Sequence, residues 1–326
     1  MIKVITVVVT YNRLELLKKC IKNLKDQTYK TDILIINNGS TDLTNSWLSE
    51  LDGVSVINQS NEGGAGGYYR GIKETFNSNY DWIWLMDDDA FPEKNCLSTL
   101  IKYNQQADVI APLVIEGNKI NNLHRGRINL DKINFPFFHK PIENSEILSN
   151  ENNIIPIDFT SFIGMLIRKD IINKIGFPNK DYFMFNDDVE YSLRIKQHQL
   201  KIILVKNACI YHKKYSDKTF KLDEYKNNLN ISKPSLFKKY KSEDIIPYFF
   251  ILGFRNSIIN ILKYGNRKKI NIIMIIYHFF KESMKSIFIY KKGIRSVCIL
   301  YISLMQGLKN IIDNNMLKEF YKDRNL

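Results

Sequence analysis

A run of apolar residues that ends in three consecutive aspartates places the strongest constraint on how this chain folds. The run reads Trp-Ile-Trp-Leu-Met over residues 82–86, and Asp87, Asp88 and Asp89 follow it directly. An uninterrupted apolar run of this length predicts a short buried strand. In open α/β sheets, ligands bind at the carboxyl ends of the strands, which is where these aspartates stand. The sequence therefore predicts a functional site at the end of this strand.

The charge of the three aspartates leaves two interpretations open. Adjacent carboxylates repel one another, so a fold that keeps them together needs solvent or a cation to offset their charge. In the first interpretation, residues 87–89 form a solvated acidic turn. In the second, they hold a divalent metal together with a diphosphate, because Mg²⁺ and Mn²⁺ prefer oxygen ligands that they share with substrate phosphates. The apolar strand before the aspartates favours the metal site.

Strand and helix patterns alternate in the N-terminal part of the chain. Residues 4–9, 33–36 and 54–57 have the composition of strands, and residues 14–24 repeat Leu and Ile at helical spacing. This order predicts an α/β fold of Rossmann-like type, with a mostly parallel central sheet covered by helices. Further strands are expected at residues 82–86, 109–115, 154–157, 159–167, 202–205 and 210–212, and a long polar connection at residues 117–153.

A glycine-rich stretch precedes the aspartates. Residues 61–71 read Asn-Glu-Gly-Gly-Ala-Gly-Gly-Tyr-Tyr-Arg-Gly, which predicts a loop whose backbone either approaches a ligand closely or is simply flexible. The spacing is not that of a dinucleotide-binding fingerprint, since counting from Gly64 places Tyr69 where the third glycine belongs. Arg70 is a candidate phosphate ligand, with a surface ion pair as the alternative.

A second acidic cluster follows further along the chain. The sequence after Asn186 fits a helix, which places Asp187 and Asp188 at the helix start. A helix N-terminus favours ionised carboxylates, so capping alone is one interpretation. The aromatic residues that precede the pair, Phe183 and Phe185, favour a second part of the functional site instead.

His212 is the histidine best placed for a functional role. A lone histidine is more often a surface residue or a satisfied core residue. The position of His212 at the end of a predicted strand, downstream of both acidic clusters, favours a third protein ligand to the metal.

All the excess positive charge lies in the last hundred residues. Residues 1–225 hold 28 Lys and Arg against 28 Asp and Glu, whereas residues 226–326 hold 19 against 6. The asymmetry predicts a neutral domain at residues 1–225 and a basic region at residues 226–326 that meets an anionic surface. Mainly helical structure is expected in the basic region, from apolar segments at residues 248–254, 258–262, 272–280 and 297–308.

Helices with apolar faces and cationic flanks are typical of proteins that lie in an anionic membrane interface. A small helical subdomain or a homo-oligomer interface is the alternative. Nucleic acid is not expected as a partner, because the aromatic residues lie in aliphatic stripes and not on base-stacking platforms.

The remaining composition points to an intracellular protein. The four cysteines are scattered, without the spacing of a zinc site or a redox motif, so we expect reduced thiols. Residues 1–3 lead directly into a predicted strand without a cleavage site, so we expect no signal peptide. No window reaches 18 uninterrupted apolar residues, which argues against a spanning helix.

Four motifs, taken together, resemble a known enzyme family. They are Thr10-Tyr11-Asn12-Arg13, Asn38-Gly39-Ser40-Thr41-Asp42, Asp87-Asp88-Asp89 and Asn186-Asp187-Asp188-Val189-Glu190. The set is similar to the GT-A glycosyltransferases of family 2. Within that family, residues 61–67, 87–90 and 187–190 resemble the bacterial galactofuranosyltransferase branch, and His212 stands where that branch places a metal-binding histidine. The resemblance covers roughly residues 1–225.

This resemblance implies an inverting, metal-dependent transferase that uses Mn²⁺ or Mg²⁺. It implies a UDP-sugar donor, UDP-galactofuranose first, and a lipid-linked or surface-polysaccharide glycan acceptor. A cytoplasmic location, peripheral on the inner face of a bacterial cell membrane, is expected. A rhamnosyltransferase or another hexosyltransferase of the same family is the alternative. A non-catalytic membrane-associated scaffold is the alternative from a different class.

The resemblance also implies roles for individual residues. Asp188 is the expected general base for the acceptor hydroxyl. Asp87, Asp89 and His212 are the expected metal ligands. Support for the base or contact with the acceptor is expected from Asp187, Glu190 and Phe185. Contact with the nucleotide sugar is expected from Thr10, Tyr11, Arg13, Asn38, Asp42, Gly64, Arg70, Asp87 and Asp88.

Overall fold

The computed structural model describes residues 2–133, 138–212, 248–289 and 293–319. By internal contacts the chain forms two compact units. The first, here called the sheet unit, comprises Met1–Arg127, Pro141–Lys180 and Asp188–Leu229. The second, the helical unit, comprises Ile128–Lys140, Asp181–Asp187 and Asn230–Leu326. The division expected at residue 225 therefore differs from the structure, because two internal segments belong to the helical unit.

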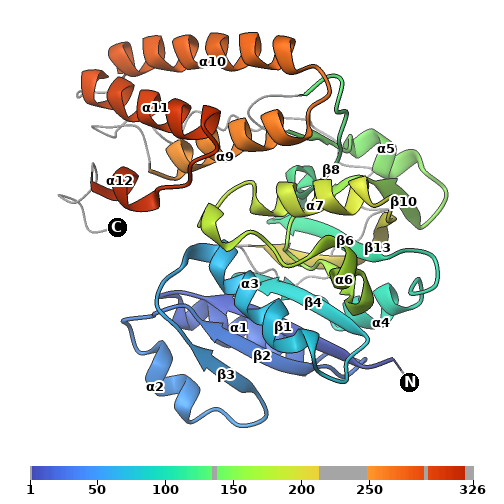
Figure 1. Ribbon diagram of the computed structural model, residues 1–326. Helices are drawn as coiled ribbons and strands as arrows, with labels where there is room; N and C mark the ends of the chain where they lie inside the picture. The colour runs from blue at the N-terminus through green and yellow to red at the C-terminus, as the bar shows by residue number, and fades with distance from the viewer. Residues whose placement is uncertain (1, 134–137, 213–247, 290–292, 320–326) are drawn as a thin grey trace. The chain divides into compact units, whose positions relative to one another are not determined.

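A ten-stranded sheet forms the centre of the sheet unit (Figure 1). Its order is β10 (Ile154–Ile157), β13 (Ile202–His212), β6 (Val109–Glu116), β12 (Leu166–Arg168), β4 (Trp82–Asp87), β1 (Val4–Thr10), β2 (Asp32–Asn37) and β3 (Ser55–Asn58). Two short strands pair off this path, β5 (Ala90–Pro92) with β13 and β7 (Lys119–Ile120) with β6. Strands β4, β1, β2 and β3 run parallel, as do β6 and β13, whereas β10 and β12 run antiparallel to their neighbours. The expected mostly parallel α/β sheet is confirmed.

Strand β4 is buried between β12 and β1. The side chains of residues 82–86 are at most 3% exposed, and the indole nitrogen of Trp84 donates a hydrogen bond to the carbonyl oxygen of Gly164 at 3.1 Å. Full burial of a large apolar side chain contributes about 1.5–3 kcal/mol. The strand is therefore firmly fixed in register, and Asp87 is fixed at its carboxyl end.

Short helices and strands complete the sheet unit. The α-helices are α1 (Leu14–Lys25), α2 (Thr44–Ser49), α3 (Gly63–Phe76), α4 (Cys96–Ile101), α5 (Asn144–Ser149), α6 (Ile172–Ile175) and α7 (Asp187–Gln197). The first residue of α7, Asp187, belongs to the helical unit. The 3-10 helices of this unit are η1 (Asn122–His124) and η2 (Lys169–Ile171), whereas η3 (Lys180–Tyr182) continues from Lys180 into the helical unit. A second sheet joins β11 (Phe159–Thr160), β8 (Arg125–Arg127) and β9 (Lys140–Pro141).

The prediction of a loop at the glycine-rich stretch is wrong, because these glycines form the start of helix α3. A Cβ atom on Gly67 would lie 2.4 Å from Cγ1 of Val9, and one on Gly71 would lie 2.2 Å from Cγ1 of Val7. Both valines belong to β1. The glycines therefore let α3 approach the sheet more closely than any other residue would allow.

Two other expectations need correction. Residues 202–212 form the single strand β13, with a register shift between Val205 and Cys209, and not two separate strands. The polar connection at residues 117–153 contains short elements, among them β7, η1, β8 and α5. Asparagine and serine side chains supply local turns and caps there, as when Asn121 accepts a hydrogen bond from the backbone N–H of Leu123.

The described part of the helical unit contains α9 (Tyr248–Tyr264), α10 (Lys268–Ile289), α11 (Gly293–Leu308) and α12 (Asn314–Glu319). Helices α10 and α11 lie side by side, and both contact α9 (Figure 1). The segments expected at residues 248–254 and 258–262 form one continuous helix, α9. Among the described helices, none is long and apolar enough to cross a membrane.

Candidate functional site

The site is built where β4 ends. Asp87 is the last residue of β4, Asp88 and Asp89 form the turn that follows, and β5 begins at Ala90. Antiparallel pairing of β5 with β13 places Ala90 opposite His212. A histidine more than a hundred residues away in the sequence is thereby brought next to the aspartates.

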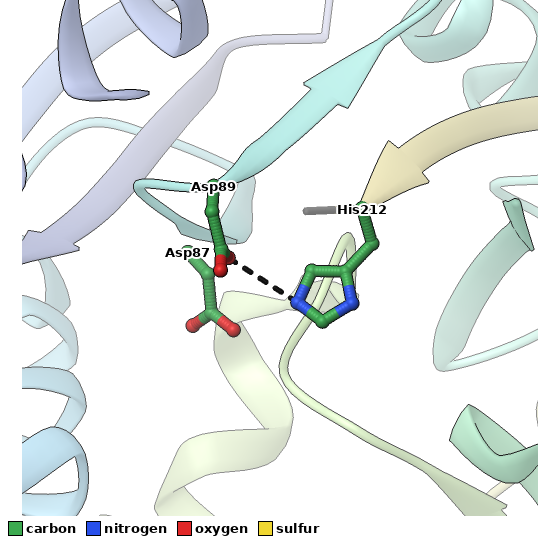
Figure 2. Close-up of side chains that lie close together, drawn as sticks. All are labelled: Asp87, Asp89 and His212. Atoms are coloured by element: carbon green, nitrogen blue, oxygen red, sulfur yellow. Dashed lines mark ion pairs between the residues drawn. The ribbon is translucent and has the colours of Figure 1, made fainter. Parts of the chain in front are cut away.

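Asp87, Asp89 and His212 converge on one point (Figure 2). Nε2 of His212 lies 3.2 Å from Oδ1 of Asp89. One donor atom from each of the three residues lies within 4.8 Å of the others, and Asp89 and His212 are both buried. Carboxylate oxygens with an imidazole nitrogen are ligands that suit Mn²⁺ or Mg²⁺. The cluster can therefore hold a divalent metal ion.

Arg13 and Thr10 meet the same aspartates. Nη1 of Arg13 donates to Oδ2 of Asp89 at 2.9 Å and to Oδ1 of Asp88 at 3.3 Å, and the hydroxyl of Thr10 donates to Oδ2 of Asp88 at 2.8 Å. Burial raises the pKa of Asp88 to about 7, although Arg13 and Thr10 lower it. Burial also raises the pKa of Asp87, as does the charge of Asp89, whereas His212 lowers it. A bound cation would offset the negative charge that remains.

Tyr68 is a site residue that sequence reasoning missed. Its hydroxyl donates a hydrogen bond to Oδ1 of Asp87, and its ring packs against Phe162 with 4.5 Å between centroids. Tyr68 stands on α3 directly after Gly67, whose close approach to β1 carries the tyrosine to the strand end. The signal for it, a tyrosine within a glycine-rich helix, is visible only once the stretch is known to be helical.

The loops after β1 and β2 lie next to this cluster, because β4, β1 and β2 are adjacent and their carboxyl ends align. Asn12, with a φ of 52°, joins the two loops, as its side-chain oxygen accepts a hydrogen bond from the backbone N–H of Thr41 at 2.7 Å. Tyr11 is 37% exposed beside it. Burial raises the pKa of Asp42, but hydrogen bonds, chiefly from Thr44, hold it below its usual value. Asp42 therefore carries a stable negative charge.

Two of the expected nucleotide-sugar residues, Asn38 and Arg70, make contacts within the protein. Asn38 is buried and donates to the carbonyl oxygen of Gly63 at 2.9 Å, which ties the loop after β2 to the start of α3. Arg70 forms an ion pair with Glu74 at 2.7 Å along the surface of α3. Gly64 faces open space.

Asp188 lies in the first turn of α7. Burial raises its pKa; the backbone N–H of Val189, which donates to its Oδ1 at 2.7 Å, lowers it, and the charge of Asp87 raises it further. The interaction between the two charges indicates that Asp188 lies close to Asp87. Glu190, which is buried, pairs with Arg194 at 2.8 Å, so its carboxylate is engaged within the helix. Asp187 and Phe185 belong to the helical unit.

Arg125 is a second residue that the sequence did not reveal. It is 1% exposed, and its guanidinium donates to the carbonyl oxygens of Pro112, His124 and Ile163 at 2.7–2.9 Å. Burial lowers its pKa to about 9, against the charges of Cys96 and Asp188. A buried cation that interacts with Asp188 favours the ionised form of that carboxylate.

Comparison with known proteins assigns a family to residues 6–176, just over half of the chain, where the sequence matches the family described as glycosyl transferase family 2. The chain is similar to galactofuranosyltransferase GlfT1 of Mycolicibacterium smegmatis, with 27% identity over 208 residues that cover 59% of this chain and 65% of that protein. It is 28% identical to galactofuranosyltransferase GlfT2 of the same organism over 194 residues, 53% of this chain and 29% of that protein. An undecaprenyl-phosphate mannosyltransferase of Micrococcus luteus is 29% identical over 126 residues, 37% of this chain and 52% of that protein. The matched part spans less than two thirds of each of these relatives.

Solved structures share the fold over nearly the whole chain. Residues 1–349 of TarS from S. aureus superpose with a TM-score of 0.54 at 12% identity, covering 98% of this chain and 83% of that one. GalNAc-T7, solved with UDP, GalNAc and Mn²⁺, gives a TM-score of 0.58 at 13% identity and covers 98% of this chain and 56% of that one.

Proposed function

Because the chain belongs to glycosyl transferase family 2, we propose that it is a glycosyltransferase. It moves a sugar from a nucleoside diphosphate donor to a glycan hydroxyl, with inversion and with a divalent metal. The observation that carries the proposal is the convergence of Asp87, Asp89 and His212 at the end of β4, with Asp188 close enough to Asp87 for their charges to interact. A single displacement at a sugar carbon requires metal ligands for the leaving group and a separate carboxylate, not bound to the metal, for the attacking hydroxyl.

The reaction assigns one role to each group. The acceptor oxygen bonds to the anomeric carbon on the face opposite the diphosphate, while the bond from that carbon to the diphosphate oxygen breaks. Asp188 takes the hydroxyl proton, for which its raised pKa suits it. Asp87, Asp89 and His212 would hold a metal ion, which stabilises the charge of the departing nucleoside diphosphate. No covalent intermediate is needed.

The donor is proposed to be a UDP-sugar. Thr10, Tyr11, Arg13 and Asp42 stand at the aligned carboxyl ends of β1 and β2, where open α/β sheets bind nucleotides. TarS of S. aureus was solved with UDP-GlcNAc bound, on a fold shared with this chain at a TM-score of 0.54. GlfT1 and GlfT2 are named as galactofuranosyltransferases, which favours UDP-galactofuranose over the rhamnosyl or hexosyl alternatives.

The acceptor is proposed to be a lipid-linked or surface-polysaccharide glycan, reached at a membrane surface through the helical unit. Helix α10 carries a stripe of exposed apolar side chains, which are Ile273, Ile276, Tyr277, Phe280, Met284, Ile287 and Phe288. The stripe repeats every three or four residues, so it covers one face of the helix. Lys268, Lys269 and Lys281 flank it, and a basic amphipathic helix of this kind binds an anionic bilayer interface.

A donor screen tests the proposal. Purified protein is supplied with Mn²⁺, a lipid-linked glycan and UDP-galactofuranose beside a panel of UDP- and dTDP-sugars. Transfer from UDP-galactofuranose, lost in Asp188→Asn while UDP binding persists, is the expected result. Transfer of another sugar alone would replace the donor and leave the enzyme class intact. Nucleotide binding without transfer from any donor would favour the scaffold.

A further inference from the structure

Helix α9 is mainly apolar but carries a buried stripe of small polar side chains. Asn256, Ser257 and Asn260 are at most 1% exposed, and with Gly253 they repeat at the three- and four-residue spacing of one helical face. Buried amides need hydrogen-bond partners. Those partners lie in the segment that directly precedes Asp187 and Asp188, and this segment belongs to the same helical unit as α9.

The side chain of Asn256 faces the backbone of this segment. Its Nδ2 lies 3.2, 3.1 and 2.8 Å from the carbonyl oxygens of Tyr182, Met184 and Phe185. Its Oδ1 accepts a hydrogen bond from Nε of Arg255 at 3.0 Å. Since carbonyl oxygens only accept, and the amide oxygen is already engaged, the NH₂ group must point at the segment.

Asn260 and Asn186 close the contact from both sides. Asn260 accepts from the hydroxyl of Tyr182 at 2.7 Å and donates to the carbonyl oxygen of Asn186 at 3.1 Å. Asn186 in turn donates to the carbonyl oxygen of Gly253 at 3.0 Å and to Oγ of Ser257 at 2.9 Å. The segment is therefore bonded to α9 in both directions.

The segment needs these hydrogen bonds because its backbone conformation is unfavourable. Phe183, Phe185 and Asn186 have φ values of 63°, 65° and 62°, and none of them is glycine. Left-handed backbone at bulky residues persists only where surrounding structure fixes it. Two residues after Asn186 comes Asp188, so the path of this backbone sets where the first turn of α7 presents its carboxylate.

We infer that Asn256 and Asn260 are positioning residues for sugar transfer: α9 holds residues 182–186 in the left-handed path that delivers Asp188 into the first turn of α7. The inference rests on the proposed role of Asp188 as the base. It gives the C-terminal helices a part in the reaction that is separate from membrane attachment.

The test compares Asn256→Ala and Asn256→Asp with Ser303→Ala. Ser303 is equally buried in the helical unit and donates to the carbonyl oxygen of Ile251 at 2.9 Å, so its variant loses a buried hydrogen bond that does not involve the segment. Asn256→Asp keeps the shape of the side chain and a partner for Arg255, but turns an oxygen toward the loop carbonyls. The retained shape and the retained partner for Arg255 favour the folding of Asn256→Asp, even if Asn256→Ala proves unstable.

Both Asn256 variants are expected to lower kcat by about a hundredfold, the scale of a misplaced catalytic group, while the Kd of UDP with Mn²⁺ stays within about twofold. Amide hydrogen exchange at residues 182–188 should accelerate in both variants and not in Ser303→Ala. A kcat for either Asn256 variant equal to that of Ser303→Ala would overturn the inference and leave the proposed function standing. Should the unaltered protein transfer no sugar, the proposed function fails. Amide hydrogen exchange then tests whether Asn256 holds residues 182–186 in place. Unchanged exchange in the Asn256 variants overturns this claim, and accelerated exchange supports it.

Discussion

Among single residues, Asp188 differs from the aspartates after β4 in what offsets its charge. Asp88 and Asp89 both accept hydrogen bonds from the guanidinium of Arg13. Asp188 accepts one from the backbone N–H of its neighbour Val189 and interacts with the charge of buried Arg125, yet burial raises its pKa. A carboxylate with a raised pKa takes a proton more readily, and perturbed carboxylates of this kind are typical of general bases.

Asp188→Asn should separate activity from stability. Loss of a general base lowers the transfer rate by about 10²–10⁴-fold. The same substitution removes a buried charge, so it should raise Tm at pH 8. Steady-state kinetics and thermal unfolding of the same preparations measure both effects. A variant that is slow and also less stable at pH 8 would indicate a structural role for the carboxylate.

The gain in Tm should depend on pH with a definite sign. The pKa of Asp188 is raised in the folded protein above its value in the unfolded chain, which is about 4. Its contribution to stability is therefore complete below about pH 4 and is lost as pH rises through the folded pKa. Melting curves of the two proteins between pH 4 and pH 8 should converge at the acid end and separate above it. A constant difference across this range contradicts the assignment.

The metal cluster predicts a stability response to Mn²⁺. A ligand at about 100 times its Kd stabilises the folded state by about 2.7 kcal/mol, or roughly 4 °C in Tm for a chain of this size. Asp89→Asn and His212→Ala should lose most of this shift. Asp52→Asn, at an exposed aspartate away from the cluster, serves as the control and should keep it. Equal shifts in all the proteins would place the ion elsewhere.

At the level of elements, the contact between α3 and β1 is the most easily tested. Gly67→Ala and Gly71→Ala place a methyl group within 2.4 Å of a valine of β1, and overpacking of this kind costs about 1–3 kcal/mol. Gly64→Ala meets open space and gains helix propensity, up to about 1 kcal/mol. In urea unfolding, the free energy of unfolding should fall for Gly67→Ala and Gly71→Ala and rise for Gly64→Ala. If Gly64 also contacts the donor, Gly64→Ala raises the KM for the donor without loss of stability.

The same contact shows why parts of the fold were predictable and parts were not. Strands β1, β2 and β4 were found because buried β-branched and aromatic runs carry a local signal. Four glycines in five residues also carry a local signal, and it points to a loop. The tertiary contact of Gly67 with Val9 overrides it, and no local pattern reveals that contact.

The residues of the candidate site also divide into those that the sequence predicts and those that only the fold reveals. Asp87, Asp89 and His212 were expected together because the ends of neighbouring strands meet at one edge of a sheet. Tyr68 and Arg125 were missed, since an aromatic residue on a helix and a basic residue in a polar stretch are unremarkable until the fold places them. Glu190 was expected to support the base or contact the acceptor, and its ion pair with Arg194 shows how helical spacing alone can engage a carboxylate.

At the scale of the whole molecule, the chain does not divide into a catalytic half and a tail. The helical unit includes Asp181–Asp187, far upstream of its main helices. A cut at residue 225, where the charge changes, would remove α9 and with it the hydrogen bonds of Asn256 and Asn260 to this segment. Composition therefore shows where the basic residues lie in the sequence, but says nothing of the part that the C-terminal helices take in the conformation of an upstream loop.

Membrane attachment through α10 can be tested without reference to activity. Phe280 and Phe288 are 62% and 79% exposed on the apolar stripe, so the double variant Phe280→Glu/Phe288→Glu should abolish flotation with phosphatidylglycerol vesicles. Leu43→Glu, at a 71% exposed apolar residue of the sheet unit, is the matched control and should float like the unaltered protein. Because each basic residue near the bilayer adds about 1 kcal/mol, binding should also weaken with salt and on neutral vesicles. A double variant that still floats would exclude the stripe as the membrane-binding face. If that variant also changes from dimer to monomer in solution, the stripe is an interface between copies of this chain.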